Sequence, residues 1–99
     1  MSAPATDLSR PGLVYFYSAR SGVCRRTEGF IAQVLQRRQN HGTFHIYRVE
    51  EGERPDLVER FHVSNVPTLV VVEEKSVRAR LERPRGCLEI ERFLAPWLH

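Results

Sequence analysis

Pro67 stands directly before an apolar, β-branched run, and this arrangement limits where the segment can lie in a fold. The residues that follow it are Thr68 and then Leu69–Val72. Proline has no amide hydrogen to donate, so it is excluded from the interior of a central strand and tolerated at a strand's first residue. The sequence therefore predicts a buried strand over Thr68–Val72 that begins immediately after Pro67.

A second apolar run, Leu13–Tyr17, is short and continuous, which is typical of a central strand covered on both faces. Ser18–Ser21 is expected to form a loop, and a helix is predicted from about Gly22 to Gln39. Apolar and small side chains recur in that segment at helical spacing and form one stripe. The members of the stripe are Cys24, Thr27, Phe30, Ile31, Val34 and Leu35. Gly42 is predicted to end the helix as a left-handed cap.

The rest of the chain predicts two further strands and two further helices. A strand over Phe44–Val49 follows the first helix. Pro55 suits the first turn of a short helix, where its missing amide hydrogen would have no partner. Val77–Glu82 alternates apolar and charged residues, which predicts a strand with one wet face. A last helix follows Gly86 and should kink or end near Pro96.

The predicted order of elements is β-α-β-α-β-β-α. We expect a right-handed parallel crossover between the first two strands and a hairpin between the last two. In the last strand, Val77, Ala79 and Leu81 are expected on the covered face. The sequence therefore predicts an α/β fold with a four-stranded mixed sheet and helices on both faces.

The composition fits one globular domain. The chain has 99 residues, of which 41% are hydrophobic and 27% charged. We expect a flexible N-terminal tail over residues 1–11 and one domain over residues 12–99. No apolar run approaches the roughly 20 residues that a membrane helix needs. Two cysteines are too few for a disulfide framework, so a cytoplasmic location is expected.

The net charge is +3, and all but one of the 15 basic residues are Arg. This bias has two interpretations, which are GC-rich codon usage and selection for anionic partners, and the sequence leaves both open. Acidic residues are interspersed along the chain, which argues against a nucleic-acid-binding stripe.

Three local features, in this order along the chain, resemble the thioredoxin family. Leu13–Tyr17, a loop and Ser21-Gly22-Val23-Cys24 correspond in spacing to the family's strand and Cys-Gly-Pro-Cys motif. Val66-Pro67-Thr68 resembles the family's Ile-Pro-Thr segment, whose proline is cis and faces the active site. Gly86 stands just before the last helix, where the family usually has a glycine. The resemblance covers about residues 12–98 and implies a short thioredoxin-like fold without the family's opening strand and helix.

The chain departs from the family pattern at positions that carry its chemistry. Ser21 replaces the first, nucleophilic cysteine, and Val23 replaces the proline of the motif. Tyr15 occupies the position of the buried Asp that handles protons, and Tyr17 that of the usual tryptophan. The resemblance therefore implies a degenerate Ser-x-x-Cys site on a retained scaffold.

The thiol chemistry depends on Ser21, Cys24 and Cys87. The attacking group in disulfide exchange must be a thiolate, which a helix N-terminus favours, and Ser21 has no sulfur. A serine at a helix start is expected to act as an N-cap. Cys24 is either a shielded, inert thiol or a monothiol that forms mixed disulfides with a protein or a low-molecular-weight thiol. Cys87 is either a small residue at a helix start or a disulfide partner of Cys24, provided that their α-carbons lie within about 7 Å.

The resemblance also implies a binding groove that does not need a cysteine, because the backbone beside the proline pairs with an extended substrate in relatives. The predicted partner-binding residues are Arg20, Ser21, Gly22, Val23, Arg25, Val66, Pro67 and Gly86. Further Arg residues expected near this groove favour an acidic protein or peptide.

Three functions remain open. The first is a protein-binding or peptide-binding module with little or no disulfide reductase activity. The second is a thiol oxidoreductase that acts through Cys24, alone or with Cys87, and the third is a structural subunit of a larger assembly. The histidines show no metal-ligand spacing with the cysteines, and we expect no metal, cofactor, nucleic acid or membrane partner.

Overall fold

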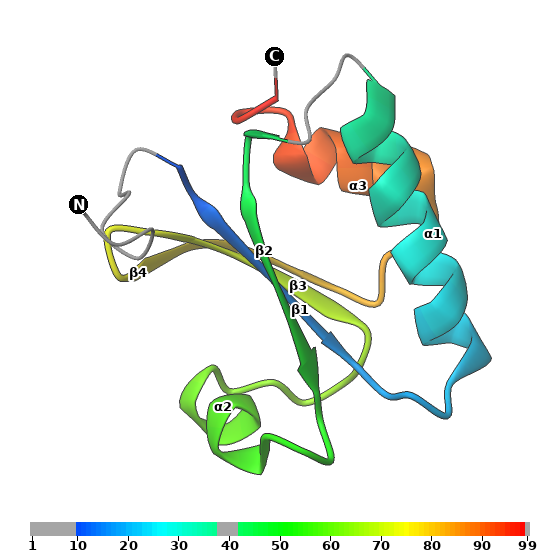
Figure 1. Ribbon diagram of the computed structural model, residues 1–99, viewed down its shortest axis with the longest axis vertical. Coiled ribbons are helices and arrows are strands. Elements are labelled where there is room, and N and C mark those ends of the chain that lie inside the picture. Colours follow the sequence, from blue (N-terminus) through cyan, green and yellow to red (C-terminus); the bar gives the residue numbers. More distant parts are fainter. Residues whose placement is uncertain (1–9, 38–41, 99) are drawn as a thin grey trace.

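The computed structural model describes residues 10–37 and 42–98, and these residues follow the predicted order β-α-β-α-β-β-α (Figure 1). The strands are β1 (Gly12–Tyr17), β2 (His45–Glu50), β3 (Thr68–Glu73) and β4 (Ser76–Glu82). The helices are α1 (Gly22–Gln36), α2 (Pro55–Arg60) and α3 (Cys87–Leu94). Every predicted strand boundary lies within one residue of the observed one, so the sequence pattern located all four strands.

The sheet has the strand order β2-β1-β3-β4. β1 pairs in parallel with β2 through the α1 crossover, and it pairs antiparallel with β3 on its other side. β3 and β4 form an antiparallel hairpin. The prediction of a four-stranded mixed sheet flanked by helices is confirmed.

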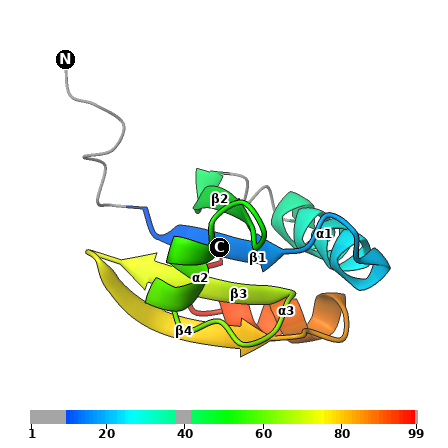
Figure 2. The same ribbon diagram turned by 90° about the horizontal axis from the view of Figure 1, so that it is seen from below.

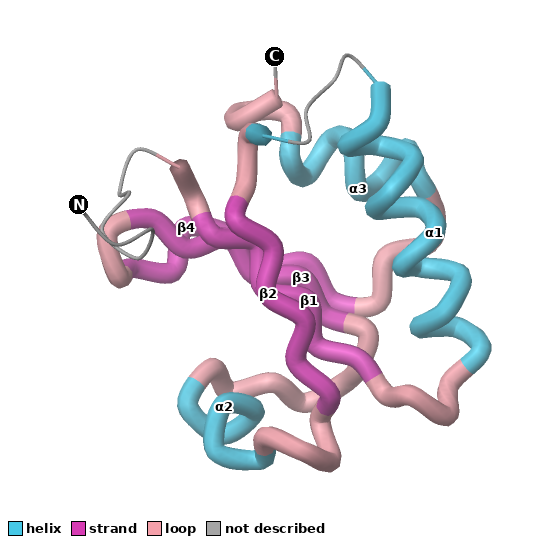
Figure 3. Tube along the Cα trace, viewed as in Figure 1, coloured by secondary structure: helices cyan, strands magenta, loops and turns pink. Residues whose placement is uncertain are grey.

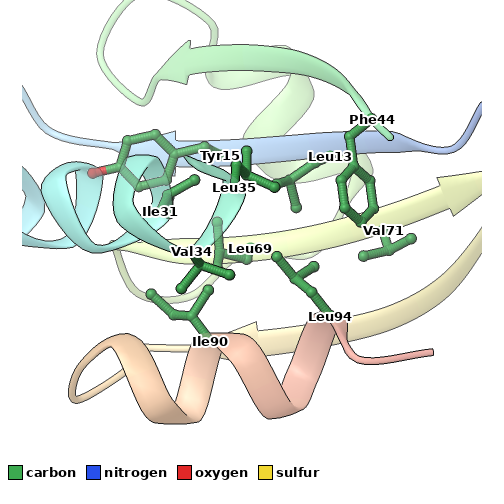
Figure 4. Close-up of a cluster of buried hydrophobic side chains, with 10 residues drawn as sticks. All are labelled: Leu13, Tyr15, Ile31, Val34, Leu35, Phe44, Leu69, Val71, Ile90 and Leu94. Atoms are coloured by element: carbon green, nitrogen blue, oxygen red, sulfur yellow. The ribbon is translucent and has the colours of Figure 1, made fainter. Parts of the chain in front are cut away.

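Helices α1 and α3 cover one face of the sheet and enclose the larger part of the core (Figure 4). Leu13 and Tyr15 of β1 point into this side, together with Leu69 and Val71 of β3. The buried members of this cluster are Leu13, Tyr15, Ile31, Val34, Leu35, Phe44, Leu69, Val71, Ile90 and Leu94. The stripe that the sequence predicts on the first helix therefore meets the same face of the sheet as the buried residues Ile90 and Leu94 of α3.

Helix α2 lies on the opposite face and covers a smaller cluster (Figure 2). The alternate residues of β1 and β3, such as Val14, Phe16 and Val70, are buried here. Because both faces of these two central strands are covered, their sequences are apolar at every position instead of alternating. Pro55 occupies the first turn of α2, as the sequence predicts.

Helix α1 ends earlier than the sequence predicts. Its last residue is Gln36, and Arg37 leaves the helix in an extended conformation with φ −63° and ψ 137°. The predicted end at Gln39 lies outside the described residues. The prediction of a left-handed cap at Gly42 is wrong, since no described glycine has a positive φ. Because α1 ends at Gln36 with the extended Arg37 as its C-cap, Gly42 is not the residue that caps it.

Val77 does not lie on a covered face, which corrects the prediction made for the last strand. Val77 is 49% exposed, whereas Ala79 and Leu81 pack against the larger core cluster. The pairing shifts between Val71 and Val72, so that Val71 pairs with Ala79 and Val72 with Val77. This irregularity interrupts the alternation of the strand and turns Val77 toward solvent.

At the N-terminal end, residues 1–9 of the predicted tail lie outside the described residues. Arg10 and Pro11 both contact the segment that leads into β2. The Arg10 guanidinium donates to the carbonyl of Phe44 at 3.0 Å, and the Pro11 carbonyl accepts the N–H of His45 at 2.9 Å.

Candidate functional site

Pro67 lies at the end of the sheet where β3 begins and where β1 and β4 finish. Thr68, the first residue of β3, pairs with Phe16 near the end of β1 and with Glu82 at the end of β4. The loop that leads to Ser21 and the loop that leads to Gly86 therefore leave the sheet at the same end of its strands (Figure 3). The topology thus brings the predicted partner-binding segments to one end of the molecule.

Ser21 is the N-cap of α1. Its backbone is extended (φ −97°, ψ 122°), and its hydroxyl oxygen accepts the N–H of Cys24 at 3.2 Å. Its carbonyl accepts the N–H of Arg25 at 3.2 Å, and its own N–H donates to the Ser18 carbonyl at 3.1 Å. The hydroxyl satisfies one of the amide donors that a helix start leaves unpaired. The expectation of a capping role for Ser21 is confirmed.

Cys24 lies within the first turn of α1 and is buried, with 1% of its surface exposed. Its sulfur accepts the N–H of Ser18 at 3.4 Å, and its carbonyl accepts the hydroxyl of Tyr15. Burial raises the pKa of the Tyr15 hydroxyl, with smaller contributions in the same direction from Cys24 and Glu28. Tyr15 is therefore a neutral donor to the helix backbone, and Cys24 is enclosed by the loop that precedes the helix.

A small hollow of about 150 Å³ opens beside Cys24. The residues that line it are Tyr17, Ser18, Ala19, Ser21, Cys24, Arg25 and Glu28. Arg20, Gly22 and Arg25 are exposed, and Val23 is 45% exposed at the start of the helix. This surface is accessible to a partner, whereas the thiol beneath it is not.

Val66, Pro67 and Gly86 lie at the same end of the strands but do not line this hollow. The Val66–Pro67 peptide bond is cis, and Pro67 is buried while Val66 is partly exposed. The Pro67 carbonyl accepts the N–H of Arg83 at 2.7 Å, which joins the start of β3 to the loop after β4. Gly86 is extended, and it precedes the first residue of α3. Its carbonyl accepts the N–H of Ile90 at 3.3 Å.

Cys87 lies against the middle of α1 and not against its start. Its sulfur contacts the side-chain oxygen of Gln33 at 2.9 Å and the carbonyl of Phe30 at 3.9 Å. Phe30 is six residues after Cys24, which corresponds to about 9 Å along a helix axis. Both cysteines are free thiols. The arrangement therefore gives no support to a Cys24–Cys87 disulfide.

Glu50 fixes the loop before α1, a role that the sequence pattern did not reveal. Its carboxylate accepts the N–H of Ala19 at 3.1 Å, and also those of Gly52 at 2.7 Å and Glu53 at 3.0 Å. These bonds, led by the one from Ala19, lower the pKa of Glu50. The only clue in the sequence is a carboxylate two residues before a glycine in a charged loop, and that pattern is common.

An aromatic and charged cluster flanks the hollow on the side of β2. The rings of Tyr15 and Tyr17 stack with centroids 5.3 Å apart, and the Arg48 guanidinium lies 5.6 Å from the Tyr17 centroid. Arg48 also forms an ion pair with Glu28 of α1. This cluster holds the exposed side of β2 against the first half of α1.

The thioredoxin family model matches residues 5–96 of the sequence. This chain belongs to the thioredoxin family. The match covers nearly the whole chain, which agrees with the resemblance drawn from the landmarks around Ser21, Pro67 and Gly86. No match was found among curated protein sequences.

Solved structures of thioredoxins share the fold at low sequence identity. Trxlp from Edwardsiella tarda superposes with a TM-score of 0.77 at 20% identity, covering 86% of this chain and 82% of that one. The germline-specific thioredoxin Deadhead from Drosophila melanogaster gives 0.75 at 19% identity, over 90% and 82%. Thioredoxin O2 from Arabidopsis thaliana gives 0.75 at 20% identity, over 92% and 77%. These likenesses establish the thioredoxin fold.

Within residues 10–37 and 42–98, no group of three or more His, Cys, Asp or Glu side chains could hold a metal ion. In the same part of the chain, no helix combines the length and apolar character that crossing a membrane requires.

Proposed function

We propose that this thioredoxin-family protein binds an extended segment of a partner protein and has little or no disulfide reductase activity. The observation that carries this proposal is the state of the Ser21–Cys24 segment. The hydroxyl at the helix start is a cap for the Cys24 amide, and the Cys24 thiol is 1% exposed. Disulfide exchange needs an accessible thiolate at the attacking position.

The backbone of Val66 supports a peptide-docking role. Pro67 directs its carbonyl to Arg83, but Val66 forms no hydrogen bond with any other described residue. Its N–H and C=O can therefore pair with an extended segment in the manner of an added strand. At the same end of the molecule, Val23 at the start of α1 is a further exposed apolar residue.

The charge around this surface favours an acidic segment. Arg20 and Arg25 are exposed on the helix side, and Arg83 and Arg85 are exposed on the loop after β4. None of these four residues takes part in an ion pair with another described residue. Unpaired guanidinium groups attract carboxylates and speed up encounter with an acidic partner.

A titration monitored by amide NMR tests the binding proposal. The probes are two synthetic peptides with the same valine positions, one rich in glutamate and the other rich in lysine. We expect the acidic peptide to shift the amides of Val66, Ser21 and Val23. Arg25→Glu should weaken this binding about three- to fivefold, whereas Arg60→Glu at the exposed end of α2 should not. Binding that ignores peptide charge, or shifts located elsewhere, would contradict the proposal.

A thiol oxidoreductase acting through Cys24 is the competing function. One observation favours it, since the Cys24 sulfur accepts an N–H from Ser18 and lies in the first turn of a helix, where a thiolate is stabilised. Because Cys87 lies apart from Cys24, Cys24 would have to act without a second thiol of this chain. Alkylation of each thiol against pH separates the two functions. Slow alkylation of Cys24 with an apparent pKa near 8.5 or above supports the binding module, and rapid reaction at neutral pH supports the oxidoreductase.

We further propose that the protein works in a reducing compartment such as the cytoplasm. Both cysteines are free thiols in the fold, and such thiols persist where glutathione and thioredoxin systems keep them reduced.

A further inference from the structure

A second, larger hollow lies away from Cys24, between the end of α2 and the β3–β4 hairpin. Its volume is about 680 Å³, which falls within the range of about 300–1,000 Å³ that is usual for small-molecule sites. The residues that line it are Arg60, Phe61, His62, Val72, Lys75, Val77 and Arg80. It is formed on the α2 face of the sheet, so it does not belong to the surface proposed for peptide binding.

The lining combines apolar walls with cationic groups. Phe61, Val72 and Val77 supply the apolar part, and the exposure of Val77 follows from the register shift in β4. Arg60, Lys75 and Arg80 supply three positive charges, and none of the lining residues is acidic. The described residues offer these three cations no carboxylate partner. A ligand that supplies the missing negative charge would therefore be favoured.

Arg80 is held in place by the end of α2. Its guanidinium donates to the carbonyl of His62 at 2.9 Å and to the carbonyl of Phe61. These bonds leave the charge of Arg80 uncompensated, because carbonyl oxygens are neutral acceptors. They also fix the distance between α2 and β4, so the hollow is formed before any ligand binds.

From this combination we propose that the hollow binds a small anionic molecule with an apolar body, such as an aromatic phosphate. The phosphate meets Arg60, Lys75 and Arg80, and the ring packs on Phe61 and Val77. The requirement for both parts distinguishes this ligand from a simple anion and from a neutral hydrophobic compound. The site is independent of the function proposed for the Ser21 surface.

Three probes of graded chemistry test the proposal on the full chain by amide NMR. Naphthyl phosphate carries both parts, naphthol lacks the anion, and inorganic phosphate lacks the ring. We expect naphthyl phosphate to shift the amides of Phe61, Lys75 and Val77 at lower concentration than either other probe, and its binding should weaken as salt is added. Equal binding of naphthol and naphthyl phosphate, or shifts outside the hollow, would overturn the proposal.

Two variants remove charge from the lining without removing a structural contact. Lys75 has a φ of 69°, which glycine adopts more easily, so Lys75→Gly should retain or improve folding. Arg60→Ala removes an exposed charge at the end of α2. Each change should weaken naphthyl phosphate binding about three- to fivefold. Arg92→Ala on α3, which makes the same change in charge on the other face, should leave binding unchanged. Equal affinity for Lys75→Gly and the unmodified protein would refute the site.

Discussion

The hydroxyl oxygen of Ser21 lies 3.2 Å from the backbone nitrogen of Cys24 and caps helix α1. One residue thus occupies the place where a helix start would stabilise a thiolate, and it uses that place for a neutral hydrogen bond. The same bond fixes the first turn and keeps the Cys24 sulfur against the Ser18 amide. The stability of this helix start and the proposed lack of reductase activity therefore depend on the same side chain.

Ser21→Ala should destabilise the protein by about 1 kcal/mol, because the Cys24 amide loses its capping acceptor. Urea unfolding followed by circular dichroism measures this difference. Ser64→Ala, at an exposed loop position, is the matched control and should change the unfolding midpoint little. An unchanged midpoint for Ser21→Ala would show that the cap contributes nothing to stability.

Ser21→Cys should give the protein measurable insulin-reducing activity with dithiothreitol as the electron donor. The new thiol would take the capping position at the start of α1, where its thiolate is stabilised, and Cys24 three residues later would resolve the mixed disulfide. The double variant Ser21→Cys/Cys24→Ala should trap mixed disulfides without turnover. If Ser21→Cys stays inactive while folded, the alignment of Ser21 with the nucleophile is wrong.

Glu50→Gln should lower stability at neutral pH and remove part of its acid dependence. The carboxylate has a lowered pKa because it accepts the N–H groups of Ala19, Gly52 and Glu53. A carboxylate whose pKa is lowered in the folded state adds stability above its unfolded-state pKa of about 4.5. This stability is lost as the pH falls through the folded-state pKa.

Thermal unfolding across the acid range checks this prediction for Glu50. The difference in midpoint between the unmodified protein and Glu50→Gln should be largest above the unfolded-state pKa and should close as the pH falls through the lowered folded-state pKa of Glu50. Glu51→Gln alters the neighbouring exposed residue and should show no such convergence. A constant offset at all pH values would contradict the role assigned to the carboxylate.

Tyr15→Phe should cost about 1 kcal/mol, since it removes the hydroxyl that donates to the Cys24 carbonyl and retains the packed ring. Burial raises the pKa of Tyr15. The stability that its neutral hydroxyl contributes is therefore complete below the unfolded-state pKa of about 10, and it is lost as the pH rises toward the folded-state pKa. The difference in free energy of unfolding between the unmodified protein and Tyr15→Phe should therefore narrow at alkaline pH. Tyr47→Phe changes a ring that is 53% exposed and is the control.

Replacing the hairpin turn Glu74-Lys75 by Asn-Gly should stabilise the protein by about 1 kcal/mol. Both turn residues have positive φ, at 50° and 69°. Residues other than glycine and asparagine adopt such angles at a cost in free energy. Differential scanning calorimetry should show a higher midpoint for the variant. Replacing Asn65, in the loop before β3, by Gly adds a flexible residue without relieving a strained one, and it should give no increase.

The periodicity of the sequence predicted the strands because burial decides their composition. Leu13–Tyr17 and Thr68–Val72 are apolar at every position, and both faces of the corresponding strands are covered. The placement of Ser21 and Pro67 at one end of the strands was implied by the resemblance to the thioredoxin family. Local composition was sufficient for the strands, and the family resemblance was needed for the site.

Features that depend on long-range contacts were not predictable in the same way. Glu50 binds Ala19, which is 31 residues away, and nothing in either segment marks the other. The exposure of Val77 depends on a pairing irregularity with a neighbouring strand. The hollow at the hairpin combines residues of α2, β3 and β4, whose side chains meet only after folding.

Helix α2 has six residues and none that is fully buried, yet among the described residues it is the one helix on its face of the sheet, where Phe61, Val63 and Val66 complete the cover. Fluctuations that lift it away should therefore require less free energy than separating α1 and α3 from the other face. Its amides are expected to exchange with deuterated solvent well before those of α1. The molecule is consequently built with one firmly closed side and one side that can open locally while the remainder stays native.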